Sequence, residues 1–143
     1  MHARTYRRAL ALLVPALGMV AGATVAAAPA QAAPLCSVSY TGYDWDATGS
    51  FPPGFQGEFL VTNNSATKTK GWRIEVHFRT GIEVLQYWNS ARLLNVPPVY
   101  VFGNVSYNGE LPKGASTSFG VIGRKSANNI PHAPADAVCA PIY

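Results

Sequence analysis

The chain has 143 residues, 48% of them hydrophobic, and a formal net charge of +4. Three of its eleven basic residues, Arg4, Arg7 and Arg8, lie at the extreme N-terminus, so residues 33–143 hold eight Lys and Arg against seven Asp and Glu. The resulting charge of +1, scattered along the chain, excludes the basic stripe that binding to nucleic acid or a membrane surface requires.

Residues 1–32 have the layout of a secretory signal peptide. The arginines form a basic n-region, an apolar run over residues 9–28 follows, and Ala30-Gln31-Ala32 is a small-x-small cleavage site. A membrane anchor is the alternative, but no basic stop-transfer cluster follows, and Pro34-Leu35 lacks the small residues that precede a lipidated cysteine. We therefore expect a secreted, extracellular protein whose folded part is one domain, residues 33–143.

Cys36 and Cys139 are the only cysteines and lie near the two ends of that domain. In an exported chain such a pair predicts one disulfide. Closing a loop of about 100 residues would contribute roughly 4 to 5 kcal/mol in the chain-entropy treatment. The two cysteines and the two histidines of the domain, His77 and His132, are too far apart in sequence to predict a metal site, and we expect no cofactor.

The first two strands predicted in chain order are residues 55–62 and 72–79. Both alternate apolar and polar side chains, which is typical of antiparallel strands that bury one face. Trp72 falls on the inner face of its strand and is therefore interpreted as a core residue. The side chains predicted to face the core are Phe55, Phe59, Val61, Trp72, Ile74, Val76 and Phe78.

Residues 82–88 follow the turn Thr80-Gly81 and are the expected hairpin partner of strand 72–79. Their alternation is imperfect, since Gln86 and Trp88 share a parity with the apolar Ile82 and Val84. A bulge or a twist is therefore expected within this strand.

Two further strands are predicted at residues 99–106 and 116–122, and a short segment, 136–139, is expected to close the sheet beside the first strand. No helix is predicted. Gly and Pro recur about every ten residues, the spacing typical of all-β sandwiches. The predicted fold class is all-β, a two-sheet antiparallel β-sandwich of the immunoglobulin-like or jelly-roll-like kind.

Four aromatic residues lie in polar, turn-rich stretches where a core does not need them. Trp88 stands between amides in Gln86-Tyr87-Trp88-Asn89, and Tyr107 precedes Asn108-Gly109. Trp45 lies between two aspartates, and Phe51 precedes two prolines. Several exposed rings on one small domain indicate a binding patch.

Sugars suit a patch of this kind. The C–H faces of β-linked glucose units pack against aromatic rings, and a rigid ring loses little side-chain entropy on binding. The amides of Gln86, Asn89 and Asn108 are candidates to bond the sugar hydroxyls. The alternative is that the rings cover loops or fill the edges of the sandwich.

In their order along the chain, these motifs resemble those of a family 2 carbohydrate-binding module, over nearly all of residues 33–143. Each motif is short and weak alone, whereas the shared order is specific. The matching motifs are Cys36-Ser37-Val38-Ser39-Tyr40, Gly54-Phe55, Thr62-Asn63, Gly71-Trp72, Gln86-Tyr87-Trp88-Asn89, Tyr107-Asn108-Gly109, Pro112-Lys113-Gly114, Phe119-Gly120-Val121 and Cys139.

The resemblance implies a two-sheet sandwich that binds crystalline cellulose, and in some members chitin or xylan, through a planar strip of three exposed rings. Trp88 matches the central ring, with Gln86 beside it, and Tyr107 stands where the family has Trp. For the first ring, Trp45 matches the spacing from the opening cysteine and Phe51 matches the spacing to the following Gly-Phe. We favour Trp45 for its larger ring and keep Phe51 as the substitute.

Gly54 is small where xylan-binding members carry Arg, which favours cellulose or chitin as the polymer. No catalytic residues are predicted: Asp44 and Asp46 occupy alternate positions of one loop, unlike the carboxylate pair of a glycosidase, and a disulfide leaves no free cysteine nucleophile. The first hypothesis is a monomeric, non-catalytic binder of insoluble β-linked polysaccharide, with cellulose preferred and chitin next. The second is a secreted β-sandwich that binds protein, as an inhibitor or adhesin, because fold alone does not decide function.

Overall fold

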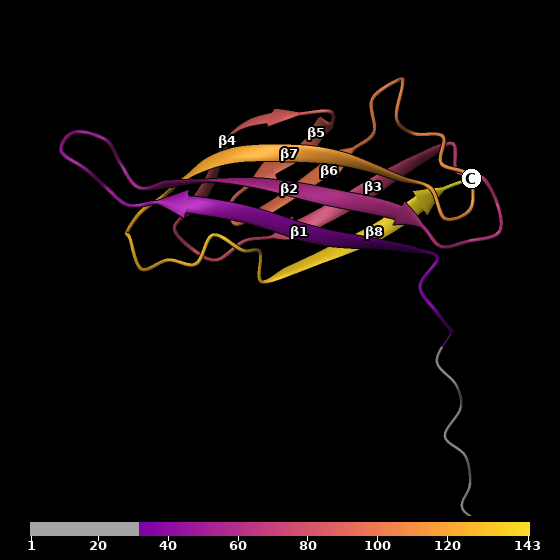
Figure 1. Cartoon of the computed structure of the whole chain (residues 1–143), viewed down its shortest axis with the longest axis horizontal. Coiled ribbons are helices and arrows are strands. Elements are labelled where there is room, and N and C mark those ends of the chain that lie inside the picture. Colours follow the sequence, from indigo (N-terminus) through magenta and orange to yellow (C-terminus); the bar gives the residue numbers. More distant parts are fainter. Residues whose placement is uncertain (1–31) are drawn as a thin grey trace, which may run out of the picture. The chain divides into compact units, whose positions relative to one another are not determined.

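The computed structural model describes residues 32–143, so the expected signal peptide, residues 1–32, lies outside the described part except for its last residue. The described residues form eight strands and no helix (Figure 1). The strands are β1 (Cys36–Trp45), β2 (Gly54–Asn63), β3 (Gly71–His77), β4 (Ile82–Trp88), β5 (Ala91–Val96), β6 (Val99–Gly103), β7 (Ser116–Lys125) and β8 (Asp136–Ile142).

The strands form two four-stranded antiparallel sheets. The first sheet has the order β1-β2-β7-β4 and the second the order β5-β6-β3-β8. The two sheets enclose one apolar core. The predicted two-sheet antiparallel sandwich is therefore confirmed.

The core between the sheets is dominated by aromatic rings. Phe119 of β7 stacks on Phe59 at 4.8 Å between ring centroids and on Trp72 of the second sheet at 5.3 Å. Burying each such side chain stabilises the fold by about 1.5 to 3 kcal/mol. All seven residues predicted to face the core are buried, Trp72 among them at 1% exposure.

The predicted hairpin between residues 72–79 and 82–88 is wrong. β3 pairs with β6 and β8, whereas β4 pairs with β7 in the other sheet. The turn at Gly81, whose φ of 91° favours glycine, carries the chain from one sheet to the other. Alternation fixes which face of a strand is buried but not which strand it pairs with, so the pattern fits either connection.

The expected bulge in β4 is confirmed. The register of β4 against β7 shifts between Val84 and Gln86. Val84 therefore points into the core, and beyond the shift Gln86 and Trp88 point outward. The extra residue of the bulge thus turns the side chains that follow it from the core to the surface.

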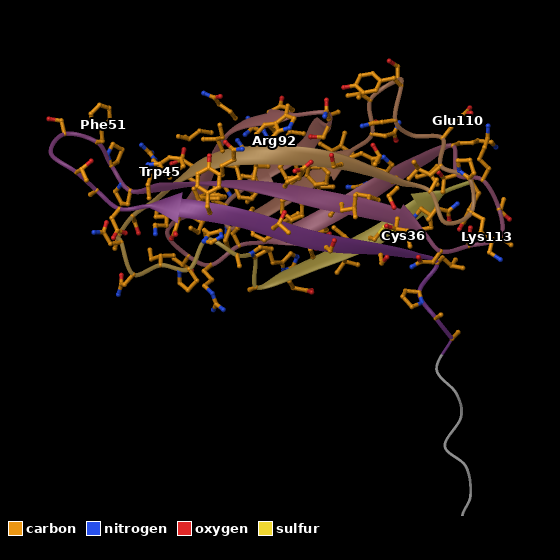
Figure 2. All side chains as sticks on the ribbon, viewed as in Figure 1. Cys36, Trp45, Phe51, Arg92, Glu110 and Lys113 are labelled. Carbon is orange, nitrogen blue, oxygen red and sulfur yellow. A yellow bond between two sulfur atoms is a disulfide. The ribbon has the colours of Figure 1, made fainter. Side chains whose placement is uncertain are left out.

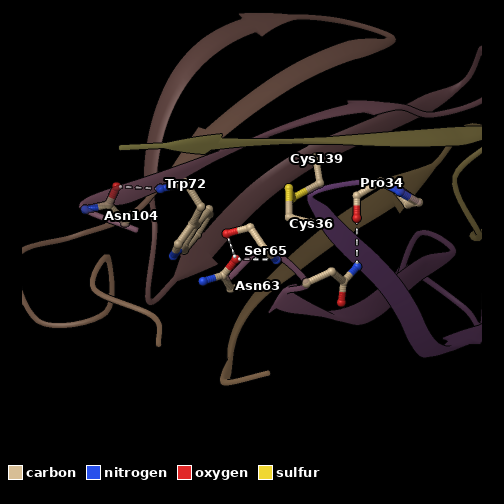
Figure 3. Close-up of a disulfide and its surroundings, with 8 residues drawn as sticks. Pro34, Cys36, Asn63, Ser65, Trp72, Asn104 and Cys139 are labelled. Carbon is tan, nitrogen blue, oxygen red and sulfur yellow. Dashed lines mark hydrogen bonds between the residues drawn. A yellow bond between two sulfur atoms is a disulfide. The ribbon is translucent and has the colours of Figure 1, made fainter. Parts of the chain in front are cut away.

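β8 lies beside β1 and is hydrogen-bonded to β3 of the second sheet (Figure 1). The expectation that residues 136–139 close the sheet beside the first predicted strand, residues 55–62, is therefore wrong in its pairing. The predicted disulfide is confirmed: Cys36 of β1 is bonded to Cys139 of β8, across the two sheets (Figure 3). Next to it, the buried amide of Asn63 accepts hydrogen bonds from the backbone N–H and hydroxyl of Ser65 and closes the end of β2.

Candidate functional site

The outward side chains of the first sheet form a grid, which we call the outer face. Strand register places them in three rows that each cross all four strands. From β1 to β4, the rows are Trp45, Gly54, Arg124 and Glu83; Tyr43, Gln56, Ile122 and Gln86; and Thr41, Glu58, Gly120 and Trp88.

Trp88 lies against the backbone of the neighbouring strand. A Cβ atom at Gly120 of β7 would overlap its indole ring, so the ring occupies the space that a side chain there would fill. The side chain of Trp88 is consequently half-buried, although it points outward. The absence of a side chain at Gly120 therefore lets the sheet itself support the ring.

Trp45 repeats this construction at the diagonally opposite end of the face. A Cβ at Gly54 of β2 would overlap its indole, and the side chain is 40% exposed. Gly120 pairs with Glu58, which is four residues from Gly54 along β2. At about 3.3 Å per residue and 4.8 Å between strands, the two glycines that support the rings are roughly 14 Å apart.

Tyr107 joins the Trp88 end of the face through Asn89. The Tyr107 hydroxyl donates to the Asn89 side-chain oxygen at 2.8 Å, and the ring is 72% exposed. Asn89 has a φ of 55°, in the left-handed region that Asn tolerates better than most residues. The structure thus brings Trp88, Asn89 and Tyr107 together, although Tyr107 lies on the loop after β6.

Asn108 does not face the surface as the sequence led us to expect. It is 8% exposed, and its amide donates to the backbone oxygen of Asn89 while its side-chain oxygen accepts from the backbone N–H of Val105. Its backbone oxygen accepts from the indole N–H of Trp72 at 2.9 Å. Asn108 therefore ties the Tyr107 loop to the end of β4 and to the core, and its side chain has no free group for a sugar.

The two candidates for the first ring occupy different places. Phe51 is 74% exposed near the tip of the loop between β1 and β2, in an isolated bridge with Thr48. Trp45 lies where β1 ends, on the sheet (Figure 2). The outer face therefore includes Trp45, Gln86 and Trp88, has Asn89 and Tyr107 at its edge, and does not include Phe51.

Sequence reasoning missed one ring of the outer face, Tyr43. It is 59% exposed, its ring centroid is 6.3 Å from that of Trp45, and its hydroxyl donates to the side-chain oxygen of Gln56 at 3.2 Å. Tyr43 and Trp45 are two residues apart on β1 and so share a face. That alternation was the available signal, but residues 36–45 were not recognised as a strand.

An ion pair between a buried lysine and a partly exposed aspartate supports the Trp45 end. The fully buried ammonium of Lys125 donates to Asp44 at 2.5 Å and to the backbone oxygen of Asn128 at 2.9 Å. This hydrogen bond holds the pKa of the Asp44 carboxyl below its usual range. The Asn128 side chain in turn accepts from the backbone N–H of Ala47, so the ion pair and this bond anchor both residues that flank the Trp45-Asp46 dipeptide.

The outer face presents side chains that can contact a ligand. Three carboxylates are engaged with basic side chains: Glu83 and Glu110 form ion pairs with Arg124 and Lys68, and Glu75 is hydrogen-bonded to His77. Within residues 32–143 no group of three metal-ligating side chains lies together, and no helix long and apolar enough to cross a membrane is present. The grid itself holds three aromatic rings, two amides and three charged side chains.

Comparison with known proteins places the chain among polysaccharide binders. The family model described as "Cellulose binding domain" matches residues 39–139. Chitinase C of Streptomyces lividans is 34% identical over 119 residues, which are 82% of this chain and 18% of the chitinase, so the chain spans less than a fifth of that relative. A cellulose/chitin binding protein of Mycobacterium bovis is 28% identical over 127 residues, 85% of this chain and 81% of that protein. The solved structure of a chitin-binding domain from Streptomyces coelicolor is 30% identical, covers 72% of this chain and 90% of that domain, and superposes with a TM-score of 0.51.

Proposed function

Because the chain belongs to the cellulose binding domain family, we propose that residues 33–143 bind insoluble β-linked polysaccharide, without catalysis, through the outer face. The observation that carries the proposal is the repeated construction of Trp45 and Trp88. Two indoles on one sheet face each lie against a glycine of the adjacent strand. Side chains held in this way are ordered before the ligand arrives, so binding costs less conformational entropy.

The space between the indoles suits a sugar chain. The middle row of the grid offers the amides of Gln56 and Gln86, which can donate to and accept from hydroxyls, with the apolar Ile122 between them. Tyr107 extends the strip beyond Trp88. We propose Trp45, rather than Phe51, as the first ring, since Trp45 lies on the same sheet face as Trp88.

The polymer we propose is crystalline cellulose first and chitin next. The description of the family names cellulose, whereas the Streptomyces relatives are a chitinase and a chitin-binding domain. We further propose that the protein is secreted, acts as a monomer and has no catalytic activity of its own. The competing hypothesis, a secreted protein-interaction domain, has no comparable support from the outer face.

Depletion from solution by cellulose, chitin and xylan, measured side by side, tests the proposal. We expect retention on cellulose and chitin, and a loss of about 30-fold or more in affinity for Trp88→Ala, as for a central anchor residue. The matched control is Tyr143→Ala, which removes an exposed ring outside the grid and should bind normally. Retention of Trp88→Ala on every polymer, or no retention of the parent protein on any, would overturn the proposal.

A further inference from the structure

The outer face continues beyond the rings as a trough over β1, β2 and the start of β7. One depression of about 230 Å³ is lined by Thr41, Tyr43, Gln56 and Glu58 with the backbone between them. A second, of about 280 Å³, adjoins it and is lined by Ser39, Thr41, Glu58, Leu60 and Ser118. The two share Thr41 and Glu58, and we call them together the Glu58 trough.

Strand register connects this trough to Trp88. Glu58 pairs with Gly120, and the indole of Trp88 lies over Gly120 from the other side. Glu58 is therefore the next outward side chain across the sheet from the ring. A sugar chain that stacks on Trp88 and runs toward β1 passes the Glu58 carboxylate, with the ring of Tyr43 one row away.

Glu58 is the one charged side chain of the grid that has no ion-pair partner among the described residues. The grid has three charged side chains, and two of them, Arg124 and Glu83, form an ion pair with each other. Glu58 is exposed and makes no ion pair with any residue of the described range. The groups around it in the trough are hydroxyls, an amide, a phenol ring and the apolar side chain of Leu60, all uncharged.

An uncompensated carboxylate under a polymer favours a cationic sugar. Covering it removes water, and unless the ligand supplies hydrogen bonds in return this desolvation opposes binding. Neutral hydroxyls replace that water only in part, whereas an ammonium forms a charge-assisted hydrogen bond roughly twice as strong. Among β-linked polymers, those with free 2-amino groups carry such an ammonium at mildly acidic pH.

We propose that the Glu58 trough is a subsite for a 2-amino sugar, so that the domain binds partially deacetylated chitin more tightly than fully acetylated chitin or cellulose. The inference rests on the proposed function, because Trp88 is the ring that holds the polymer beside Glu58. Tyr43 supplies the apolar surface of the subsite, and Glu58 accepts hydrogen bonds from the ammonium.

Binding isotherms on cellulose, fully acetylated chitin and partially deacetylated chitin, at mildly acidic pH and at low and high salt, test the subsite. We expect about tenfold tighter binding to the deacetylated polymer at low salt, and a preference that shrinks as salt screens the charge. Glu58→Gln should abolish the preference, by lowering the affinity for the deacetylated polymer to that for the acetylated one. Glu110→Gln changes the net charge equally on an exposed residue outside the grid and should keep the preference.

The outcomes separate the two proposals. A parent protein without any preference for the deacetylated polymer, or a Glu58→Gln variant that keeps the preference, would overturn the subsite and leave polysaccharide binding intact. Undiminished binding of Trp88→Ala to all three polymers would instead overturn the proposed function of the outer face. A preference that Glu110→Gln loses as fully as Glu58→Gln would reduce the effect to net charge and also overturn the subsite.

Discussion

At the Trp88 end of the outer face, neutral amides hold the rings, whereas at the Trp45 end an ion pair made by a buried lysine does so. The first end depends on Asn89 and Asn108, which connect Tyr107, the end of β4 and the indole of Trp72. The Trp45 end depends on the ion pair between Lys125 of β7 and Asp44 of β1. Two rings that each lie on a glycine are thus fixed by different surroundings, one uncharged and one ionic. The two surroundings should respond differently to mutation and pH.

The difference follows from what lies under each end. Asn108 lies next to the core tryptophan, where hydrogen bonds between uncharged groups are stable and do not titrate. Lys125 is the last residue of β7, and its ammonium is enclosed by Asp44 and the loop around Asn128. A charge enclosed in this way requires its partner, so the Trp45 end is the more sensitive to changes in ionisation.

The largest effect is expected from breaking the neutral end. Asn108→Ala removes the side-chain partners of the Val105 N–H and the Asn89 backbone oxygen, two backbone groups in part-buried hydrogen bonds. Leaving such groups unsatisfied should lower the free energy of unfolding by about 1 to 3 kcal/mol. Chemical denaturation measures this loss. Tyr107→Phe, which removes one exposed hydrogen bond of the same network, is the control, and an equal loss in both variants would contradict the role of Asn108.

The glycines under the rings test whether the two ends share one construction. Gly120→Ala and Gly54→Ala each place a Cβ where an indole now lies, so the ring must move away from the sheet. We expect affinity for crystalline cellulose to fall about tenfold in each variant, which corresponds to about 1.4 kcal/mol. Gly103→Ala, on β6 of the other sheet, controls for the substitution itself in the binding isotherm, because the nearest atom to its Cβ is the end of the exposed Leu93 side chain, at 3.0 Å. Unchanged binding in both ring variants would show that the glycines do not position the rings.

The charged end should respond to acid, and the neutral end should not. The pKa of Asp44 is lowered in the folded protein, so the ionised carboxylate stabilises the folded state. This stabilisation is fully present above the ordinary Asp pKa of about 3.9, and it is lost as pH falls through the lowered pKa of the folded state. We therefore expect Asp44→Asn to weaken cellulose binding several-fold at neutral pH, and the variant to lose the acid dependence that the parent shows below about pH 4. A parent and variant with the same acid profile would contradict the role of the ion pair.

At alkaline pH the stability should fall through a different group, Tyr40, whose pKa is raised rather than lowered. Burial, and to a smaller extent the nearby Asp44 carboxylate, raises the pKa of Tyr40. The neutral phenol is therefore favoured in the folded state, and its contribution is complete below about pH 10 and lost as pH rises through the raised folded pKa. Denaturation at increasing pH should show stability falling in the parent and falling less in Tyr40→Phe. Equal slopes would contradict this origin of the alkaline loss.

The smallest effect is expected from Tyr43, which extends the Trp45 end. Tyr43→Ala removes a 59% exposed ring whose hydroxyl bonds only to Gln56. We expect cellulose affinity to fall about twofold to fivefold, less than for either tryptophan, with little change in stability because the residue is exposed. Phe51→Ala, at the loop tip, is the matched control in the same binding isotherm. A larger loss of affinity for Phe51→Ala than for Tyr43→Ala would show that the loop-tip ring, and not Tyr43, contributes to binding.

Much of the fold followed from side-chain alternation, because a half-buried strand imposes a period of two on its sequence. The inward set around Trp72 and the bulge before Gln86 were predictable on this basis. The pairing of β3 and β4 was not, since parity contains no information about the partner strand. β5 was missed because Leu93 and Leu94 are adjacent apolar residues at a bulge, which disrupts the alternation.

Part of the candidate site could likewise be predicted from the sequence, and part could not. Trp88 and Gln86 could be placed outward from the break in alternation, and Trp45 from its polar neighbours. The burial of Asn108 could not be predicted, because an Asn-Gly turn at the surface and an Asn that caps a loop from inside have the same sequence. The support beneath Trp45 was equally hidden, since Asp44 and Lys125 are 81 residues apart.

The three tryptophans allow the most direct test, since the indole N–H of each gives its own nuclear magnetic resonance signal. Titration with a soluble β-linked glucose oligosaccharide should shift the signals of Trp45 and Trp88. The Trp72 signal should stay in place, because its N–H is buried and bonded to Asn108. Movement of Trp72 alone, or of no indole at saturating ligand, would contradict binding through the outer face.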